Sequence, residues 1–545
     1  MMASPGPKSP EQSEKSKKYD RQLRLWGDHG QSALESCHIC LINATGLGTE
    51  ILKSLVLPGI GGFTIVDGKK ITEEDIGANF FLDVDSVDKP RAQVATQLLL
   101  ELNPEVKGDY VDEPIEQLLQ NNPNFFKNFT VVVAASLPER MLITLSDLLW
   151  EADIPFIATR SYGLIGSARL QIREHTIIET HPDTQNPDLR LDQPFPALVK
   201  HLEAIDLTKM DLKDHAHVPY VVPLYQTLQE WKSTHSGNLP KNYKEKEEFR
   251  NLLRKGIKMN EDGVQEYEEN FEEALRAVNF AVAPTVVPNN VKDILNDYNC
   301  INLTSKSKPF WIMAKAVRDF VDNEGEGLLP LRGSLPDMTA DSQRYIALQQ
   351  VYLQEAARCS EIVHRRVRQL LHQLGQPVDA ISEADTKLFC KHAASLGVVR
   401  GRKISDEYDT KLINTSLLAQ GVENSESLII YYVMFRGIDR FYAEYNHYPG
   451  EFGDEHDIVK LKGSIAKLLS EWGCGPLAKD DYIHEIYRYG GAELHSVSAF
   501  LGGCVAHEVI KLVTAQYKPI NNTFIYDAIT TNTETIDITN LHGLF

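Results

Sequence analysis

The stretch CHICLINATGLGTEILKSLVLPGI, residues 37–60, decides the fold, because an apolar run in it ends at a turn of small residues and an apolar-periodic helix follows. This order of strand, turn and helix is typical of the first unit of a nucleotide-binding domain. That unit normally carries G-x-G-x-x-G, whose glycines let a phosphate approach the backbone. Here the three positions hold Asn43, Thr45 and Gly48. The sequence therefore predicts the scaffold of a phosphate site without two of its glycines.

Length and charge limit the classes of protein that this chain can belong to. Its 545 residues exceed one ordinary core, so we expect about two to four domains. The net charge of −20 disfavours nucleic acid or an anionic membrane as the main partner and suits a basic protein partner. No run approaches the roughly 18 apolar residues of a membrane span. Residues 1–18 lack the apolar segment of a secretory signal and are interpreted as a disordered tail.

The cysteines indicate a reducing compartment and no metal site. The chain has seven, an odd number scattered along the sequence, as is typical of free thiols in the cytoplasm or nucleus. Cys37 and Cys40 form C-x-x-C, but they lie in a predicted buried strand and no second pair exists. A structural zinc site needs four ligands, so we predict none here.

The chain has an α/β pattern at both ends and a helical pattern between them. Residues 19–170 alternate apolar runs with helix-periodic stretches, and runs such as CLINA, FTIVD and TVVVAA show no polar alternation. Strands covered on both faces have this composition, so we predict a Rossmann-like, doubly wound parallel sheet. Residues 171–485 are charged and helix-periodic, and residues 486–545 return to the first pattern. The predicted fold is an α/β domain interrupted by a large, mostly helical insertion.

Three segments carry a resemblance to a known family. KYDRQLRLWGDHGQSALES precedes the opening stretch, NFFLDVDSVDKPRAQVATQLLLELNP follows it, and ELHSVSAFLGGCVAHEVIK lies near the end. With these segments in this order, the chain resembles the ubiquitin-like-modifier activating enzymes and their bacterial adenylating relatives, the ThiF/MoeB-like proteins. A tyrosine-x-arginine-glutamine entry before the first strand is not a general Rossmann feature, so the resemblance is specific.

The resemblance implies a division of labour between two subunits. The chain is similar to the non-catalytic members of heterodimeric activating enzymes, which implies a pseudo-adenylation domain in residues 19–170 and 486–545. It implies that residues 171–485 are part of a catalytic-cysteine domain without the cysteine. An obligate catalytic partner would bind ATP and Mg, and the pair would adenylate the C-terminal glycine of a ubiquitin-like modifier and form a thioester on the partner's cysteine. No cofactor and no metal are expected in this chain itself.

Compared with the active family pattern, the predicted nucleotide site has lost its charged groups. Ala78 stands where an arginine would contact phosphate, and Ala135, or Ser136 with a shifted gap, stands where an aspartate would hold magnesium. Asp67 remains where a carboxylate takes the ribose hydroxyls, although a strand-end aspartate is also an ordinary turn residue. Adenylyl transfer relies on charge neutralisation, so we predict a degenerate site. The same comparison places Lys69, Asp75 and Arg91 where the active pattern has aspartate, asparagine and lysine.

One functional group remains in the YDRQ motif, residues 19–22, which precedes the first predicted strand. The resemblance implies that Arg21 reaches the ATP in the partner's pocket as an arginine finger in trans, with Arg24 as the neighbouring candidate. A guanidinium suits this role because it is always charged and forks onto phosphate oxygens. The alternative is that Arg21 pairs with a carboxylate on a helix surface. None of the thiols of the helical region is expected to be catalytic: Cys300, Cys359, Cys390 and Cys474.

Other functions share parts of this pattern. A self-sufficient homodimeric adenylating or sulfur-transfer enzyme of the bacterial type would need the missing magnesium carboxylate. An NAD-dependent oxidoreductase would need the intact glycine turn. A scaffold that enters no active site would leave Arg21 without a catalytic role. The predicted helix with Gly502 and Gly503 belongs to the α/β scaffold and is expected at the dimer contact, unless it packs only within its own domain.

Overall fold

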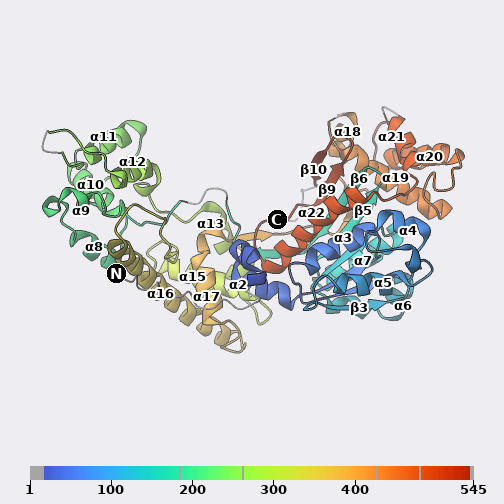
Figure 1. Ribbon diagram of the computed structural model, residues 1–545, viewed down its shortest axis with the longest axis horizontal. Helices are drawn as coiled ribbons and strands as arrows, with labels where there is room; N and C mark the ends of the chain where they lie inside the picture. Colours follow the sequence, from blue (N-terminus) through green and yellow to red (C-terminus); the bar gives the residue numbers. More distant parts are fainter. Residues whose placement is uncertain (1–16, 183–185, 260–262, 425, 478–479, 540–545) are drawn as a thin grey trace, which may run out of the picture. The chain divides into compact units, whose positions relative to one another are not determined.

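The structure is a computed structural model that describes residues 17–182, 186–259, 263–424, 426–477 and 480–539. The chain forms two compact units (Figure 1). Unit 1 holds Met1–His175 and Val398–Phe545, and unit 2 holds Thr176–Gly397. The tail predicted for residues 1–18 lies outside the described residues except for its last two positions.

Unit 1 is built on an eight-stranded sheet in the order β10-β9-β6-β5-β4-β1-β2-β3. The first five strands along the chain pair in parallel, as predicted. The other three strands pair antiparallel. Between β5 and β6 the connection is only Gly163 and Leu164, which is too short for a parallel crossover. The strands are β1 His38–Ile42, β2 Gly62–Val66, β3 Lys107–Val111, β4 Val131–Ala135, β5 Phe156–Tyr162, β6 Ile165–Gln171, β9 Thr523–Asp527 and β10 Asn532–Ile536.

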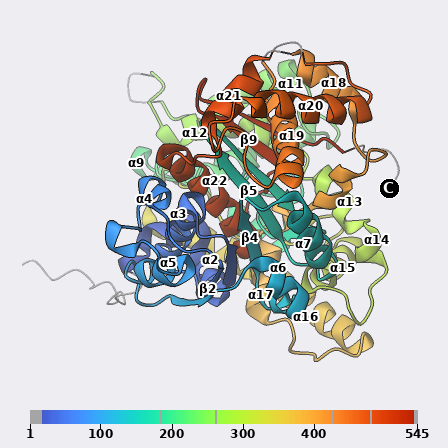
Figure 2. The same ribbon diagram turned by 90° about the vertical axis from the view of Figure 1, so that its right-hand side faces the viewer.

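Helices cover both faces of the parallel strands (Figure 2). One face packs against α2 Asp20–Ser36, α3 Gly46–Val56, α5 Arg91–Leu100 and α22 His495–Thr514. The opposite face packs against α6 Ile115–Asn121 and α7 Glu139–Glu151. Every residue of β2 and β4 is buried, which explains why their sequences are apolar without alternation.

Helix α22 is a core helix of unit 1. By length and composition alone it could cross a membrane, which corrects the expectation that no segment has that character. Its apolar side chains, however, join the core around β1 and α3, and its closest neighbour is α3. A Cβ added at Gly502 would lie 2.9 Å from Glu50 Cβ and 3.2 Å from the Ile51 nitrogen, so this glycine permits the close approach of the two helices.

The return to unit 1 occurs earlier than the sequence indicated. We predicted it at residue 486, whereas the compact unit resumes at Val398. The helices between these positions pack on the antiparallel part of the sheet, with Tyr162, Ile165, Ile525 and Ile536 in their core. An apolar stripe shows that a helix is covered but not by which domain, so their sequences did not reveal this. They are α18 Thr415–Glu423, α19 Ile429–Tyr445, α20 His456–Glu471 and α21 Asp481–Tyr489.

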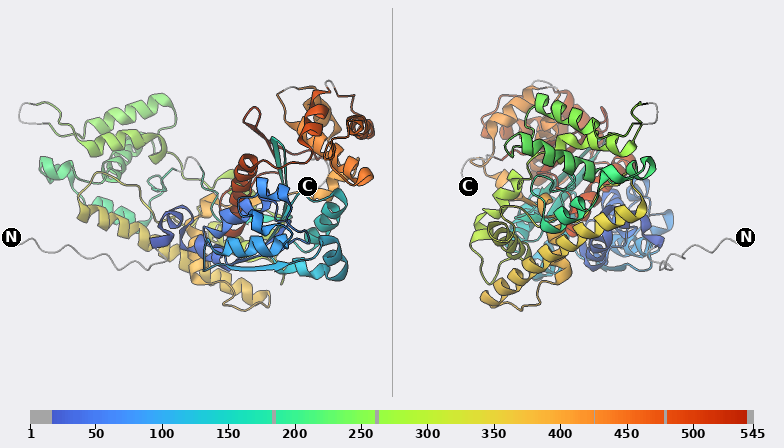
Figure 3. Two further views of the ribbon diagram at one scale, coloured as in Figure 1. Left: turned by 45° about the vertical axis from the view of Figure 1, so that its right-hand side comes forward. Right: turned by 90° about the vertical axis from the view of Figure 1, so that its left-hand side faces the viewer.

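Unit 2 is helical, as predicted for this part of the chain (Figure 3). Its longest helix, α16 Ser342–Gln373, begins where the Asp341 side chain accepts hydrogen bonds from two backbone N–H groups. It ends just before Gly375, whose φ of +68° favours glycine. Its other helices are α8 Pro196–Glu203, α9 Leu212–His215, α10 Val221–Thr234, α11 Tyr243–Arg254, α12 Glu269–Ala281, α13 Asn289–Leu295, α14 Tyr298–Ile301, α15 Pro309–Asp322 and α17 Glu383–Lys391.

Alanine substitutions at the two neighbouring glycines of α22 are expected to have opposite effects on stability. Gly502→Ala forces a methyl group against α3 and is expected to lower the free energy of unfolding of unit 1 by about 1–3 kcal/mol. Gly503→Ala adds a methyl group where no atom lies within 4 Å, and alanine favours a helix over glycine by about 0.5–1 kcal/mol. Urea denaturation of the two variants measures both effects. Equal stability of the two variants would contradict the packing described for α22.

Candidate functional site

Asn43 occupies the first glycine position of the turn after β1 and keeps a glycine-like backbone. Its φ is +68°, a left-handed conformation that asparagine tolerates better than most residues. Its side-chain Nδ2 donates a hydrogen bond of 2.8 Å to the carbonyl oxygen of Ala135, at the end of β4. The turn therefore retains its shape, while its side chain ties two neighbouring strands together.

The next residues of the turn serve helix α3 rather than a ligand. The Thr45 hydroxyl accepts a hydrogen bond of 3.3 Å from the Gly48 N–H, so the chain caps its own helix. A Cβ at Gly48 would lie 2.5 Å from the backbone carbonyl oxygen of Asn43, and one at Gly46 would lie 2.6 Å from the backbone carbonyl oxygen of Ala78. Close backbone packing alone explains why these two glycines remain.

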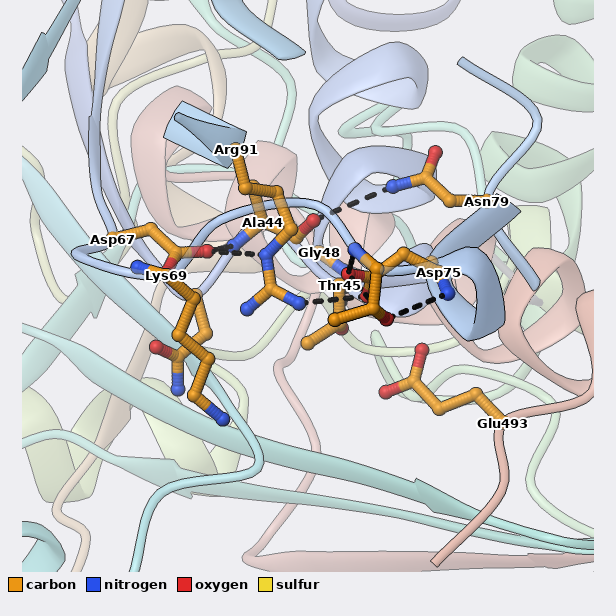
Figure 4. A network of polar contacts seen from close by, with 12 residues as sticks. Ala44, Thr45, Gly48, Asp67, Lys69, Asp75, Asn79, Arg91 and Glu493 are labelled. Atoms are coloured by element: carbon orange, nitrogen blue, oxygen red, sulfur yellow. Dashed lines mark hydrogen bonds and ion pairs between the residues drawn. The ribbon is translucent and has the colours of Figure 1, made fainter. Parts of the chain in front are cut away.

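A carboxylate of the same chain lies at the N-terminus of α3 (Figure 4). Glu493 Oε2 accepts a hydrogen bond of 3.0 Å from the Leu47 N–H. Helix N-termini attract anions because their N–H groups are unpaired and the helix dipole is positive there, which is why phosphates bind at this place in related folds. The segment is fixed by a hydrogen bond of 2.7 Å from the Gly163 N–H to the Ala492 oxygen. Burial raises the pKa of the Glu493 carboxyl above its ordinary value.

An ion-pair triad around the buried Arg91 and Asp67 fills the neighbouring part of the site (Figure 4). Arg91 Nε lies 2.7 Å from Asp67 Oδ2, and Arg91 Nη1 lies 2.8 Å from Asp75 Oδ1. Burial opposes the charge of Arg91, but the two aspartates outweigh it, and the pKa of Arg91 is raised. Asp67 also accepts hydrogen bonds from the N–H groups of Ala44 and Lys69. Both oxygens of Asp67 are thus engaged within the chain, which favours the turn role over a ribose contact.

Two of the predicted positions, Ala78 and Ala135, offer no charge to a nucleotide. Ala78 is the last residue of α4 Glu73–Ala78. Ala135 is the last residue of β4, and its side chain is buried. Next to Ala78, the Asn79 side chain donates to the Ala44 oxygen and accepts from the Thr49 hydroxyl. Among the described residues, no group of three histidine, cysteine or acidic side chains could hold a metal ion. Neither alanine supplies the magnesium carboxylate or the phosphate-binding cation of the active pattern.

Arg21 and Arg24 lie one turn apart at the exposed start of α2, in different electrostatic states. Arg24 Nη2 lies 3.2 Å from Asp20 Oδ2. A surface pair of this kind was the alternative role considered for Arg21, but here it is formed by Arg24. Arg21 has no ion pair or hydrogen-bond partner among the residues that the structure describes. The helix start beside it is anchored: the buried Tyr19 hydroxyl donates to Glu105, and Gln22 donates to the Pro58 oxygen. Sequence reasoning had not assigned these two anchors.

The thiols of the helical region are held in unreactive environments. Cys300, Cys359 and Cys390 are buried, and burial raises the pKa of each thiol, to about 12 for Cys300. Burial also raises the pKa of the partly exposed Cys474. A nucleophilic cysteine needs a lowered pKa, so these environments support the prediction that none of the four is catalytic.

Similarity to known proteins extends over nearly the whole chain. The model of the ThiF family matches residues 19–543. The NEDD8-activating enzyme E1 regulatory subunit of Danio rerio is 51% identical over 526 residues, covering 96% of this chain and 99% of that protein. The Drosophila melanogaster protein of that name is 48% identical over 542 residues, 98% of this chain and 100% of its own length. The Arabidopsis thaliana subunit AXL is 41% identical over 515 residues, 94% of this chain and 97% of its own length.

Removing Arg91 tests the triad. Arg91→Leu leaves the buried Asp67 carboxylate without its cation, which is expected to lower the free energy of unfolding by about 3–5 kcal/mol. Adding Asp67→Asn in the same chain removes the unpaired charge, so the double variant should be more stable than Arg91→Leu alone. Thermal unfolding followed by circular dichroism measures this. Arg24→Leu, which breaks an exposed pair, is the control and should cost at most about 1 kcal/mol.

Replacing Glu493 tests the carboxylate at the helix terminus. Glu493→Ala leaves the buried Leu47 N–H without an acceptor, at a cost of about 1–3 kcal/mol, whereas Glu493→Gln keeps an acceptor oxygen. Hydrogen–deuterium exchange of residues 46–56 should therefore accelerate in the alanine variant and much less in the glutamine variant. Equal exchange in wild type and the alanine variant would contradict the contact.

The raised pKa of Glu493 adds a pH dependence with a defined sign. The folded chain binds this proton more tightly than the unfolded chain, so the contribution of Glu493 to stability falls as pH rises from about 4.3 through the raised pKa. Glu493→Gln does not titrate. Its stability relative to wild type should therefore increase between pH 4.5 and neutrality.

Proposed function

The chain belongs to the ThiF family, and from this premise we propose that it is the regulatory, non-catalytic subunit of a heterodimeric NEDD8-activating enzyme. Together with a catalytic partner it would use ATP to adenylate the C-terminal glycine of the ubiquitin-like modifier. The modifier would then form a thioester with a cysteine of the partner. End-to-end similarity to regulatory subunits from animals and a plant supports this role.

The observation that carries the proposal is the filling of the phosphate position by the chain's own charges. Glu493 lies where a phosphate would meet α3, and Arg91 is already neutralised by Asp67 and Asp75. A triphosphate entering this lobe would meet a carboxylate at the helix terminus and an arginine whose charge two aspartates already neutralise. This supports ATP and Mg binding in the partner subunit and no cofactor in this chain. It also argues against the self-sufficient homodimer and the NAD-dependent enzyme.

In the proposed heterodimer, Arg21 acts as an arginine finger on ATP held by the catalytic subunit. Its charge is not neutralised among the described residues, and Tyr19 and Gln22 fix the helix start that carries it. A positioned guanidinium loses little order when it binds phosphate oxygens in a fork. Arg24 is a weaker candidate because Asp20 already pairs with it.

The outer face of α22 supports a place for the partner. Phe500 is 44% exposed and packs its ring 4.2 Å from that of Tyr526. One turn further, Gly503 has open space beside it, while Gly502 faces α3. An exposed aromatic ring beside an uncovered helix backbone suits a protein contact.

The free thiols of the described cysteines are compatible with a reducing compartment, so we place the enzyme in the cytoplasm or nucleus.

Substitution of Arg21 tests the proposed function. ATP–pyrophosphate exchange is measured with the chain alone and with the chain reconstituted with its catalytic partner and the modifier. The chain alone should show no exchange, and Arg21→Ala should slow the exchange of the pair by about 10²-fold, as loss of a transition-state charge contact does. Arg24→Ala, from the same helix, should change it less than twofold. Unchanged exchange with Arg21→Ala would favour a scaffold role, and exchange by the chain alone would favour the homodimer.

A further inference from the structure

A groove in unit 2 lies along the exposed side of α16, in a different unit from the site described above. It has a volume of about 570 Å³ and lies between α16 and the segment that leads into α17. Ligand pockets in proteins have volumes of about 300–1,000 Å³, so the groove can take a short peptide segment. Its charged and titratable lining comprises Glu361, His364, Arg365, Arg368, His372 and Glu383.

The helical period places the cations of α16 in one exposed line. Arg365, Arg368 and His372 are separated by three and four residues, so they share a face, and all three are exposed. The opposite face, with Val363, Val367 and Leu371, is buried in the core of the unit. The line is therefore a surface feature that the packing of unit 2 does not use.

The two central arginines form no ion pair within the described part of the chain, although Glu324, which pairs with Arg366, also lies within electrostatic range of Arg365. Neither Arg365 nor Arg368 has an ion pair or a side-chain hydrogen bond with a described residue. Arg366, on another side of the same helix, lies 2.6 Å from Glu324 Oε2, and Arg358 lies 2.6 Å from Glu355 Oε1. In a chain of net charge −20, carboxylates are abundant, so two adjacent unpaired guanidinium groups in a groove are a selective feature.

We propose that this groove binds a short acidic segment of a partner protein, with its carboxylates on Arg365 and Arg368. The line from Arg365 to His372 is about 10 Å long at about 1.5 Å per helical residue. An extended peptide covers this length in about three residue steps of about 3.3 Å. Arginine binds carboxylates through two parallel hydrogen bonds. The amides of Gln369 and Gln373, which also line the groove, can bind the backbone of the segment.

The acidic residues of the groove determine which anion fits. Glu361 lies one turn before Arg365 on the same line, and Glu383 lies at the start of α17. A continuous phosphate backbone would extend past the arginines and meet these carboxylates as well as the negative charge of the whole chain. A peptide with two to four carboxylates is short enough to contact the arginines without reaching Glu361 and Glu383. The groove therefore favours an acidic peptide over a nucleic acid.

The test uses the full-length chain and a fluorescein-labelled tetraglutamate peptide in fluorescence anisotropy titrations. They are run at low ionic strength, where exposed charge pairs are least screened. The test variant is Arg365→Gln with Arg368→Gln. The matched control is Arg358→Gln with Arg366→Gln, which removes the same charge from the same helix at arginines that are already paired. A tetraglutamine peptide and an octathymidine strand are the comparison probes, and circular dichroism confirms that both variants are folded.

The proposal predicts that the test variant binds the tetraglutamate peptide at least fivefold more weakly than wild type, while the control stays within twofold. Wild type should bind the tetraglutamine peptide too weakly to detect. Equal weakening in test and control variants would show general electrostatic attraction and overturn the proposal. So would unchanged binding by the test variant, or tighter binding of octathymidine that the same two arginines control.

Discussion

The ion pair between Arg91 and Asp67 is the constraint on which the degenerate site depends. Asp67 directly follows β2 with its side chain fully buried, and it orders the turn after β1 by accepting a hydrogen bond from the Ala44 N–H. A buried carboxylate without a cation is unstable, so the site needs a positive group that remains in place whether or not a ligand is bound. Arg91 at the start of α5 is this positive group, and Asp75 forms a second ion pair with the same guanidinium. A guanidinium held in this way is not available to a phosphate.

The same logic explains Glu493. Backbone N–H groups at a buried helix terminus require acceptors, and in a working nucleotide site the ligand supplies them. A carboxylate of the same chain supplies one permanently and without the entropy cost of binding a separate molecule. Unit 1 can therefore keep the strand–turn–helix of a nucleotide-binding domain as a stable scaffold in the absence of nucleotide. The exposed start of α2 and the outer face of α22 are the surfaces of this scaffold to which we assign the proposed function.

Several of these features could be predicted from the sequence because they depend on local spacing. Asn43, Thr45 and Gly48 follow from the motif positions, and the parallel strands follow from apolar runs without alternation. The contact of Glu493 with Leu47 joins residues 446 positions apart, and no local pattern carries that information. The position of α18–α21 in unit 1 was missed for a similar reason, since amphipathic helices do not identify the surface that covers them. Arg91 was identified as a replaced lysine, but only the structure shows that two aspartates neutralise it.

The arginines of this chain show how environment, rather than residue type, separates structural from functional groups. Arg91 is buried and shared by two carboxylates, and Arg24 and Arg366 are exposed and paired with one each. A chain with 76 acidic and 56 basic residues has many carboxylates for its cations, so an arginine left without an ion pair on an ordered helix keeps a charge that a partner outside the chain can bind. Arg21 on α2 meets this criterion in unit 1, and Arg365 with Arg368 on α16 meets it in unit 2. The anions that these residues fit differ, because Arg21 lies alone on an anchored helix start whereas the α16 pair lies in a groove bounded by carboxylates.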